Sequence, residues 1–113
     1  MSVSAAFTPT GNTVVIDAAT SYPPAVQAPS NTGTSMQYRI INSSTTVGCF
    51  LSWGQTQAAA QANSLVPNAN VSTAVIHVLP NTDEILTFAP NTWFTAITAS
   101  SSCTLYIVPG DGM

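Results

Sequence analysis

Short runs in which apolar and polar residues alternate occur along most of the chain, separated by clusters of Pro, Asn, Gly and Ser. This period of two, combined with many β-branched and aromatic residues, is typical of strands that bury one face. The pattern predicts eight strands, at residues 3–8, 12–18, 35–42, 46–53, 72–79, 83–88, 92–99 and 103–108. We therefore expect an all-β protein, with residues 1–113 folded as one antiparallel sandwich domain.

Three segments depart from the strand pattern. Residues 22–35 contain three prolines and predict an extended loop or an edge segment that cannot donate fully to a ladder. Residues 56–64, "TQAAAQANS", predict a helix of barely two turns that crosses one end of the sandwich. Residues 1–11 are a candidate flexible N-terminal arm that could reach a neighbouring molecule, for example by adding a strand to its sheet.

Alternation also assigns side chains to faces. The predicted sets that share a face are Met36, Tyr38 and Ile40; Gln37, Arg39 and Ile41; Val47, Cys49, Leu51 and Trp53; and Cys103, Leu105 and Ile107. Both cysteines thus lie among apolar neighbours. We expect buried free thiols rather than a disulfide, because the N-terminus has no secretory signal, although facing strands could also bring the two within pairing distance.

The tripeptide Pro-Asn-Thr occurs at 80–82 and again at 90–92. Proline presets φ for the second position of a turn, and asparagine tolerates the third. The spacing of ten residues leaves one strand between the turns. It predicts a meander in which 83–88 and 92–99 form a hairpin, with Phe88 and Trp93 near its closed end.

The composition combines 45% hydrophobic residues with only 4% charged residues. Ser, Thr, Asn and Gln supply 42 of the 113 residues, so the polar surface is nearly uncharged. Such a surface costs less free energy to desolvate than one rich in lysine, and it lacks the charges that keep strand edges apart. We infer that much of this surface lies against other protein.

The chain has no lysine, Arg39 is its only permanent cation and the formal net charge is −3. Nucleic acids and anionic membranes are bound mainly through several Lys or Arg contacts, so neither is an expected partner. No basic segment followed by an apolar run marks a signal peptide, and no stretch has the ~18 apolar residues of a membrane span. We expect synthesis in a cytoplasm.

Residues with catalytic potential are few and scattered. Asp83 and Glu84 are adjacent on a predicted strand, so their side chains leave opposite faces and cannot converge on one atom. The single histidine, His77, is expected to be half-buried or at an interface, and Cys49, Cys103 and His77 lack metal-site spacing. The terminal "PGDGM", 109–113, predicts a turn and tail rather than a phosphate site. We expect no catalytic residue, no metal site and no cofactor.

Three segments carry a resemblance to a known class of protein: "QYRIINSS" at 37–44, "EILTFAPNTWFTAI" at 84–97 and "CTLYIVPGDGM" at 103–113. With them, the chain resembles the small β-rich decoration or cement proteins of tailed bacteriophages. The resemblance implies a jelly-roll-like sandwich that forms dimers or trimers. It also implies binding to the outside of the capsid, where the protein bridges major capsid subunits against internal DNA pressure.

The leading hypothesis is therefore a non-enzymatic virion structural protein whose partner is the major capsid protein. It would be made in the host bacterial cytoplasm and located on the capsid surface. The candidate interface residues are Phe7, Tyr22, Arg39, Trp53, Trp93 and Phe94. Alternatives are a carbohydrate-binding module, which requires Trp53 or Trp93 exposed in a groove, and an adhesin subunit; a hydrolase is more remote.

Overall fold

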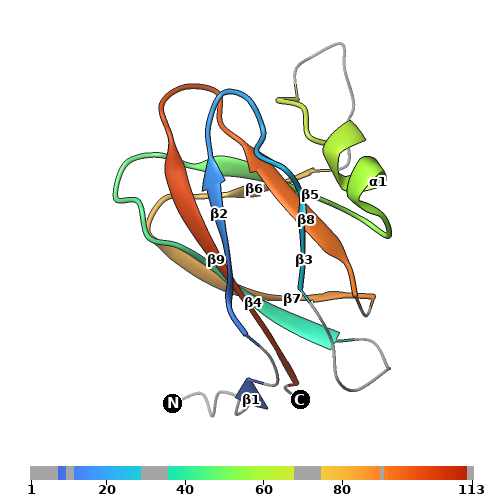
Figure 1. Cartoon of the computed structure of the whole chain (residues 1–113). Helices are drawn as coiled ribbons and strands as arrows, with labels where there is room; N and C mark the ends of the chain where they lie inside the picture. The colour runs from blue at the N-terminus through green and yellow to red at the C-terminus, as the bar shows by residue number, and fades with distance from the viewer. Residues whose placement is uncertain (1–7, 10–11, 29–35, 68–74, 90, 112–113) are drawn as a thin grey trace.

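The computed structural model describes residues 8–9, 12–28, 36–67, 75–89 and 91–111. These residues form two antiparallel sheets that face each other, with one short helix beside the second sheet (Figure 1). The all-β sandwich predicted from the strand pattern is confirmed.

Sheet A has the order β1-β9-β4-β7, and β2 also pairs with β9. Its strands are β1 (Thr8–Pro9), β2 (Val14–Ala18), β4 (Met36–Asn42), β7 (Thr82–Phe88) and β9 (Cys103–Asp111). β1 and β2 share one edge of β9, where they pair with residues 110–111 and 103–107. The sheet is therefore four strands wide.

Sheet B has the order β3-β8-β5-β6. Its strands are β3 (Val26–Gln27), β5 (Cys49–Gly54), β6 (Val75–Val78) and β8 (Trp93–Ile97), and helix α1 (Gln57–Ala62) lies between β5 and β6 in the chain. From β2 to β9 the chain changes sheet at every connection except β5 to β6. The orders β2-β9-β4-β7 and β3-β8-β5-β6, connected in this way, are those of a jelly roll.

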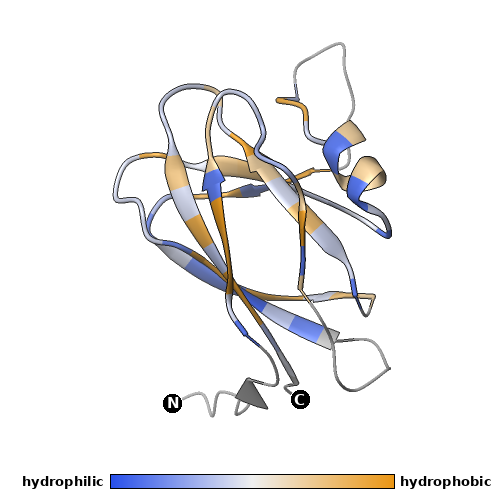
Figure 2. Cartoon of the chain, in the orientation of Figure 1, coloured by the Kyte–Doolittle hydropathy of each residue, from blue (hydrophilic) through white to orange (hydrophobic). Residues whose placement is uncertain are grey.

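One apolar core fills the space between the sheets. Hydrophobic residues alternate with polar ones along the strands (Figure 2), and the inward set is buried. The core includes Ile16, Tyr38, Ile40, Cys49, Leu51, Val78, Phe94, Cys103, Leu105 and Ile107, with Val47 and Trp53 partly buried against it. The structure describes the side chains of all residues in the predicted apolar sets except Met36. For these described residues, the predicted assignment to the inward face is confirmed.

An aromatic cluster occupies one part of this core. The ring centroids of Tyr38 and Phe94 are 5.2 Å apart, those of Phe88 and Phe94 5.1 Å, and those of Trp53 and Phe88 5.4 Å. Tyr38 and Phe88 belong to sheet A, whereas Trp53 and Phe94 belong to sheet B. These contacts therefore join the two sheets, and each edge-to-face pair contributes about 0.5–1.5 kcal/mol beyond area burial.

The predicted hairpin of 83–88 with 92–99 is wrong. β7 pairs with β4 in sheet A, and β8 pairs with β3 and β5 in sheet B. Both Pro-Asn-Thr segments thus lead from one sheet to the other, so the chain is not a meander. The pattern of alternation could not distinguish these cases, because a strand has the same period whichever sheet it joins.

The two turns nevertheless share one construction, which the sequence repeat indicated. Asn81 and Asn91 have φ of 56° and 61°, a left-handed conformation that asparagine adopts more readily than most residues. The hydroxyls of Thr82 and Thr92 donate to the carbonyl oxygens of Leu79 and Ala89, each at 2.6 Å. The Pro-Asn-Thr motif therefore forms a turn that connects one sheet to the other.

Several element boundaries differ from the prediction. "PGDGM" is not a turn and tail, because β9 continues to Asp111 and pairs with β1 and β4. Within 22–35, Val26–Gln27 forms edge strand β3, in agreement with the predicted edge segment. Residues 3–7 and 72–74 of two predicted strands, and most of the arm at 1–11, lie outside the described residues.

Helix α1 is capped by Thr56, whose hydroxyl accepts from the backbone N–H of Ala59 at 3.1 Å. The sequence predicted that this helix crosses one end of the sandwich, but the structure places it against a strand. The hydroxyl of Ser52 in β5 donates to the carbonyl oxygen of Ala60 at 3.0 Å. A Cβ added to Gly54 would lie 2.7 Å from the Ala60 nitrogen. The helix therefore lies directly on the outer side of β5.

Candidate functional site

The outer side of sheet A carries an apolar surface, which we call the sheet-A face. Alternation places its members opposite the core-facing residues of the same strands. Its members are Val15, Arg39, Ile41, Asp83, Ile85, Tyr106 and Val108, and the polar residues Asp17, Gln37, Thr87 and Thr104 lie on the same side of the sheet. Val15, Ile85 and Tyr106 are exposed, and Ile41 and Val108 are partly buried.

Strand register makes this face contiguous. Val15 pairs with Tyr106, and Tyr106 pairs on its other side with Ile41. In the next row, Arg39 lies between Val108 and Ile85. Such cross-strand neighbours have Cβ atoms about 4.5–5.5 Å apart. Val15 and Ile85 remain 49% and 47% exposed, so the face is open in the described structure.

Three charged side chains lie on this side of the described strands, and two of them neutralise each other. Arg39 Nε donates to Asp83 Oδ1 and Oδ2 at 2.9 and 3.0 Å, and its Nη2 also contacts Oδ2. The hydrogen bond from Arg39 holds the pKa of the Asp83 carboxyl below its usual value, and the same bond raises the pKa of Arg39. The face therefore presents apolar side chains around a neutral ion pair, and edge strand β2 adds the Asp17 carboxylate, which accepts from the Thr104 hydroxyl at 3.2 Å.

The outer side of sheet B is different, because other parts of the chain cover half of it. Ser52 lies beneath α1 and also hydrogen-bonds to the Thr95 carbonyl at 3.2 Å. The Thr95 hydroxyl donates to the carbonyl oxygen of Pro23 at 2.8 Å. Both side chains are fully buried. Polar groups here satisfy one another within the chain instead of facing solvent.

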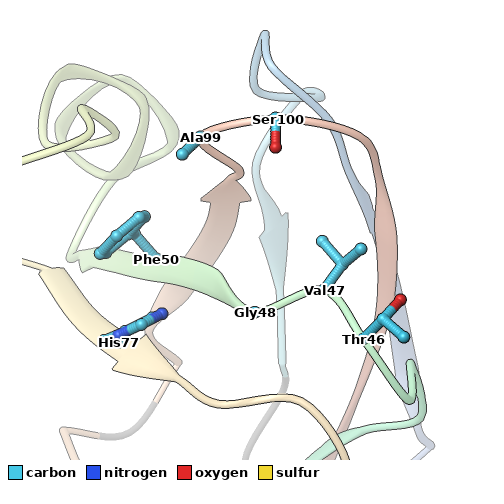
Figure 3. Close-up of a pocket in the computed structure, with 7 residues that line it drawn as sticks. All are labelled: Thr46, Val47, Gly48, Phe50, His77, Ala99 and Ser100. Atoms are coloured by element: carbon cyan, nitrogen blue, oxygen red, sulfur yellow. The ribbon is translucent and has the colours of Figure 1, made fainter.

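At the uncovered end of the same sheet, two rings stack. Phe50 and His77 are register partners on β5 and β6, with centroids 4.5 Å apart and ring planes 17° from parallel. They line a pocket of about 290 Å³ together with Thr46, Val47, Gly48, Ala99 and Ser100 (Figure 3). His77 is exposed rather than half-buried, and its ring is part of the pocket wall.

Buried polar side chains hold both loops at the rim of this pocket. Asn42, which is fully buried, donates through Nδ2 to the carbonyl oxygens of Val47, Val78 and Leu79 at 3.0, 3.3 and 3.2 Å. On the other rim, the Thr98 hydroxyl donates to the Ser101 carbonyl at 2.7 Å. These bonds hold both loops in place.

Cys49 and Cys103 are both buried free thiols, as the sequence favoured, and they lie on the inner faces of opposite sheets. Burial raises the pKa of both thiols, and the neighbouring Cys103 raises that of Cys49 further. The pair is therefore unreactive at neutral pH.

The structure distributes the predicted interface residues over several environments. Tyr22 and Arg39 are exposed, and Trp53 and Trp93 are half-buried. Phe94 is fully buried in the core, so it is not available for an interface, and Phe7 lies outside the described residues. Of the members that the structure describes, Arg39 alone belongs to the sheet-A face. The sequence could have indicated the other apolar members of this face, because they are apolar residues, such as Ile41, at positions that alternation assigns to the outward side of a strand.

Acidic residues and potential metal ligands do not gather within the described parts of the chain. Asp83 and Glu84 lie opposite Ile41 and Ile40 and so point to different faces, as predicted. The described residues contain no group of three or more His, Cys, Asp or Glu side chains that could hold a metal ion. Nor do they contain a helix with the length and apolar character needed to cross a membrane.

Comparison with protein-family models, with curated proteins and with solved structures finds no match to this chain.

Proposed function

We propose that this protein is a non-enzymatic virion component that binds the outer surface of a phage capsid and stabilises it by bridging major capsid subunits. The observation that supports the proposal is the sheet-A face, an apolar surface on which Arg39 and Asp83 are already paired and the remaining carboxylate, Asp17, lies on an edge strand and accepts from Thr104. Covering such a face requires little desolvation of charge, whereas a face with unpaired Lys or Glu would resist it. The composition is consistent with this, since only 4% of residues are charged.

The size of the face indicates how it would be used. A surface four strands wide and about five residues long covers on the order of 300 Å². A stable pair of proteins needs about 800 Å² on each partner, so one copy on one site would bind weakly. A symmetric shell repeats the site many times, and a dimer or trimer of the chain would engage several at once, which raises the overall affinity.

The test is binding to shells assembled from the major capsid protein of the same genome. The wild-type protein is expected to co-sediment with these shells and to raise the temperature at which they disassemble. Ile85→Lys places a charge in the sheet-A face and is expected to abolish co-sedimentation. Leu65→Lys is a matched control, because Leu65 is also 47% exposed but lies after α1.

The proposal is wrong if wild-type protein does not bind the shells, or if Ile85→Lys and Leu65→Lys bind equally well. Circular dichroism and thermal unfolding of each variant separate loss of binding from loss of folding. A source genome without a capsid gene would also contradict the proposal.

A second candidate function is carbohydrate binding. The feature that favours it is not the exposed tryptophan that was expected from the sequence. Trp53 is packed against the core and contacts Phe88, so it forms no exposed platform. The stacked rings of Phe50 and His77 at the pocket are the feature that supports saccharide binding.

A further inference from the structure

The pocket beside Phe50 and His77 has the dimensions of a site for one small ring. Its volume of about 290 Å³ is at the lower end of the ~300–1,000 Å³ typical of ligand pockets. In Figure 3, the two rings lie on one side, Val47 and Thr46 lie on the other, and Ala99 and Ser100 lie along the top. A single monosaccharide unit, rather than a long chain, is the size of ligand that such a space accommodates.

Gly48 makes the position of the imidazole possible. A Cβ at this residue would lie 2.9 Å from His77 Nε2 and 3.1 Å from the carbonyl oxygen of Val78. Any larger residue would displace the His77 ring from the wall. The stack is therefore built from three positions, with Phe50 and His77 supplying the rings and Gly48 supplying the space.

The pocket lining contains no Lys, Arg, Asp or Glu. The Arg39–Asp83 pair lies on the outer face of the other sheet, so it supplies no counter-charge to the pocket. An anionic or cationic ligand would lose hydration there without a compensating partner. A neutral ligand is thus the class that fits the site.

The remaining lining combines an apolar wall with a few polar groups. The Phe50–His77 stack offers an aromatic surface, and Thr46 and Ser100 add hydroxyls that both donate and accept hydrogen bonds. A pyranose ring has a matching division, with C–H groups on one face and hydroxyls at its edge. From this geometry we infer that the pocket binds one pyranose unit of a neutral glycan.

The supporting loops are consistent with a site formed in advance. Asn42 bonds the 43–48 loop to the end of β6, and the Ser44 hydroxyl accepts from the backbone N–H of Val47 at 2.9 Å. Thr98 closes the opposite rim. A site whose loops are already ordered spends less binding free energy on ordering them. Phe50 and His77 also face away from sheet A, so docking through the sheet-A face would leave the pocket open to solvent.

The experiment begins with an array of neutral and acidic glycans, followed by a two-dimensional NMR titration with the neutral monosaccharides that bind. Resonances of Phe50, His77 and Ser100 are expected to shift. Phe50→Ala and His77→Ala are expected to weaken binding about tenfold or more, the equivalent of ~1.4 kcal/mol. Tyr22→Ala, which removes an exposed aromatic ring outside the pocket, is expected to bind as wild type.

Ala99→Arg, on the exposed rim, fills the pocket without removing a core contact, and it tests the inference if Phe50→Ala fails to fold. The inference is overturned by the absence of any shift at the pocket up to the solubility limit of the sugars. It is also overturned by equal binding of the pocket variants and Tyr22→Ala, or by binding of acidic glycans alone.

Capsid docking and saccharide binding can fail separately. His77→Ala is expected to retain shell binding, and Ile85→Lys is expected to retain saccharide binding, because the two residues lie on the outer faces of different sheets. A variant that loses both activities while remaining folded would contradict the assignment of two sites.

Discussion

The two sheets use their outer faces in opposite ways. Sheet A leaves Val15, Ile85 and Tyr106 open to solvent around one ion pair, whereas sheet B is half covered by α1 and by the segment near Pro23. The buried polar groups on the outer side of sheet B therefore form their hydrogen bonds within the chain. Sheet A has no such cover among the described residues, and its apolar surface remains available for another molecule. The difference is consistent with the proposed role of the sheet-A face as a docking surface.

The inner faces of the two sheets, in contrast, are both closed by the shared core. The reactivity of the Cys49 and Cys103 thiols tests whether this closure is complete. Burial raises the pKa of Cys49 and Cys103, so at pH 8 the thiolate fraction is lower than in a free cysteine. Labelling by iodoacetamide is expected to be slower than in an unfolded chain by a factor on the order of 10³ or more, because it requires opening of the core. Mass spectrometry over time measures the rate.

Ser102→Cys is the matched control, since residue 102 is exposed and adjacent to Cys103. It should label at the rate of a free thiol. Equal labelling of Cys103 and residue 102 in the native variant would show that the inner faces are not closed.

Gly54→Ala tests whether α1 is held tightly against sheet B. The added Cβ would meet the Ala60 nitrogen at 2.7 Å and the Ala59 carbonyl carbon at 2.9 Å, both backbone atoms of the helix. We expect a loss of about 1–3 kcal/mol in the free energy of unfolding, measured with urea. Gly48→Ala should cost less, because its closest contact is the end of the His77 side chain, which can turn aside. A cost at Gly54 no greater than at Gly48 would contradict close packing of the helix.

Thr95→Val and Thr87→Val compare a covered threonine with an exposed one. Thr95 is fully buried and donates to the Pro23 carbonyl, which would lose its partner. We expect a destabilisation of about 1–2 kcal/mol for Thr95→Val. Thr87, exposed on β7, should change stability by less than about 0.5 kcal/mol. If thermal unfolding gave the two variants the same stability, the cover over sheet B would contribute nothing through this bond.

The smallest effect is expected at the ion pair of the sheet-A face. Asp83→Asn removes a carboxylate that is 43% exposed, so solvent screening limits the loss to about 0.5 kcal/mol or less. The folded-state pKa of Asp83 is depressed, so its contribution is present above the ordinary value of about 4 and is lost as the pH falls through the folded-state pKa.

Unfolding in urea at pH 7 and near pH 2 should therefore show a small difference between wild type and Asp83→Asn that disappears in acid. An unchanged difference at both pH values would mean that the Arg39 contact does not account for it.

Much of the fold could be predicted because alternation is local. β4 was expected at 35–42 and occurs at Met36–Asn42, and the inward positions of Tyr38 and Ile40 followed from the same period. The alanine-rich run within 56–64 similarly located α1. Each of these features depends on residues within a few positions of one another in the chain.

The candidate sites were less predictable, because they join residues distant in sequence. Phe50 and His77 become neighbours only when β5 pairs with β6, and the 98–102 turn reaches the same place from β8. Val15 and Tyr106 belong to opposite ends of the chain. Aromatic content alone directed attention to Phe94, which the structure places in the core.

By itself, the sequence determined that this protein folds as a β-sandwich, which side of most strands faces the core, where its turns occur and that its surface is nearly uncharged. These properties follow from backbone periodicity, turn chemistry and composition, which act locally. Tertiary structure alone decided that the Pro-Asn-Thr turns cross between sheets, that α1 covers sheet B and that the sheet-A face stays open. Strand pairing selects among partners with the same period, and the contacts that settle the choice, such as Phe88 with Phe94, exist only in the packed core.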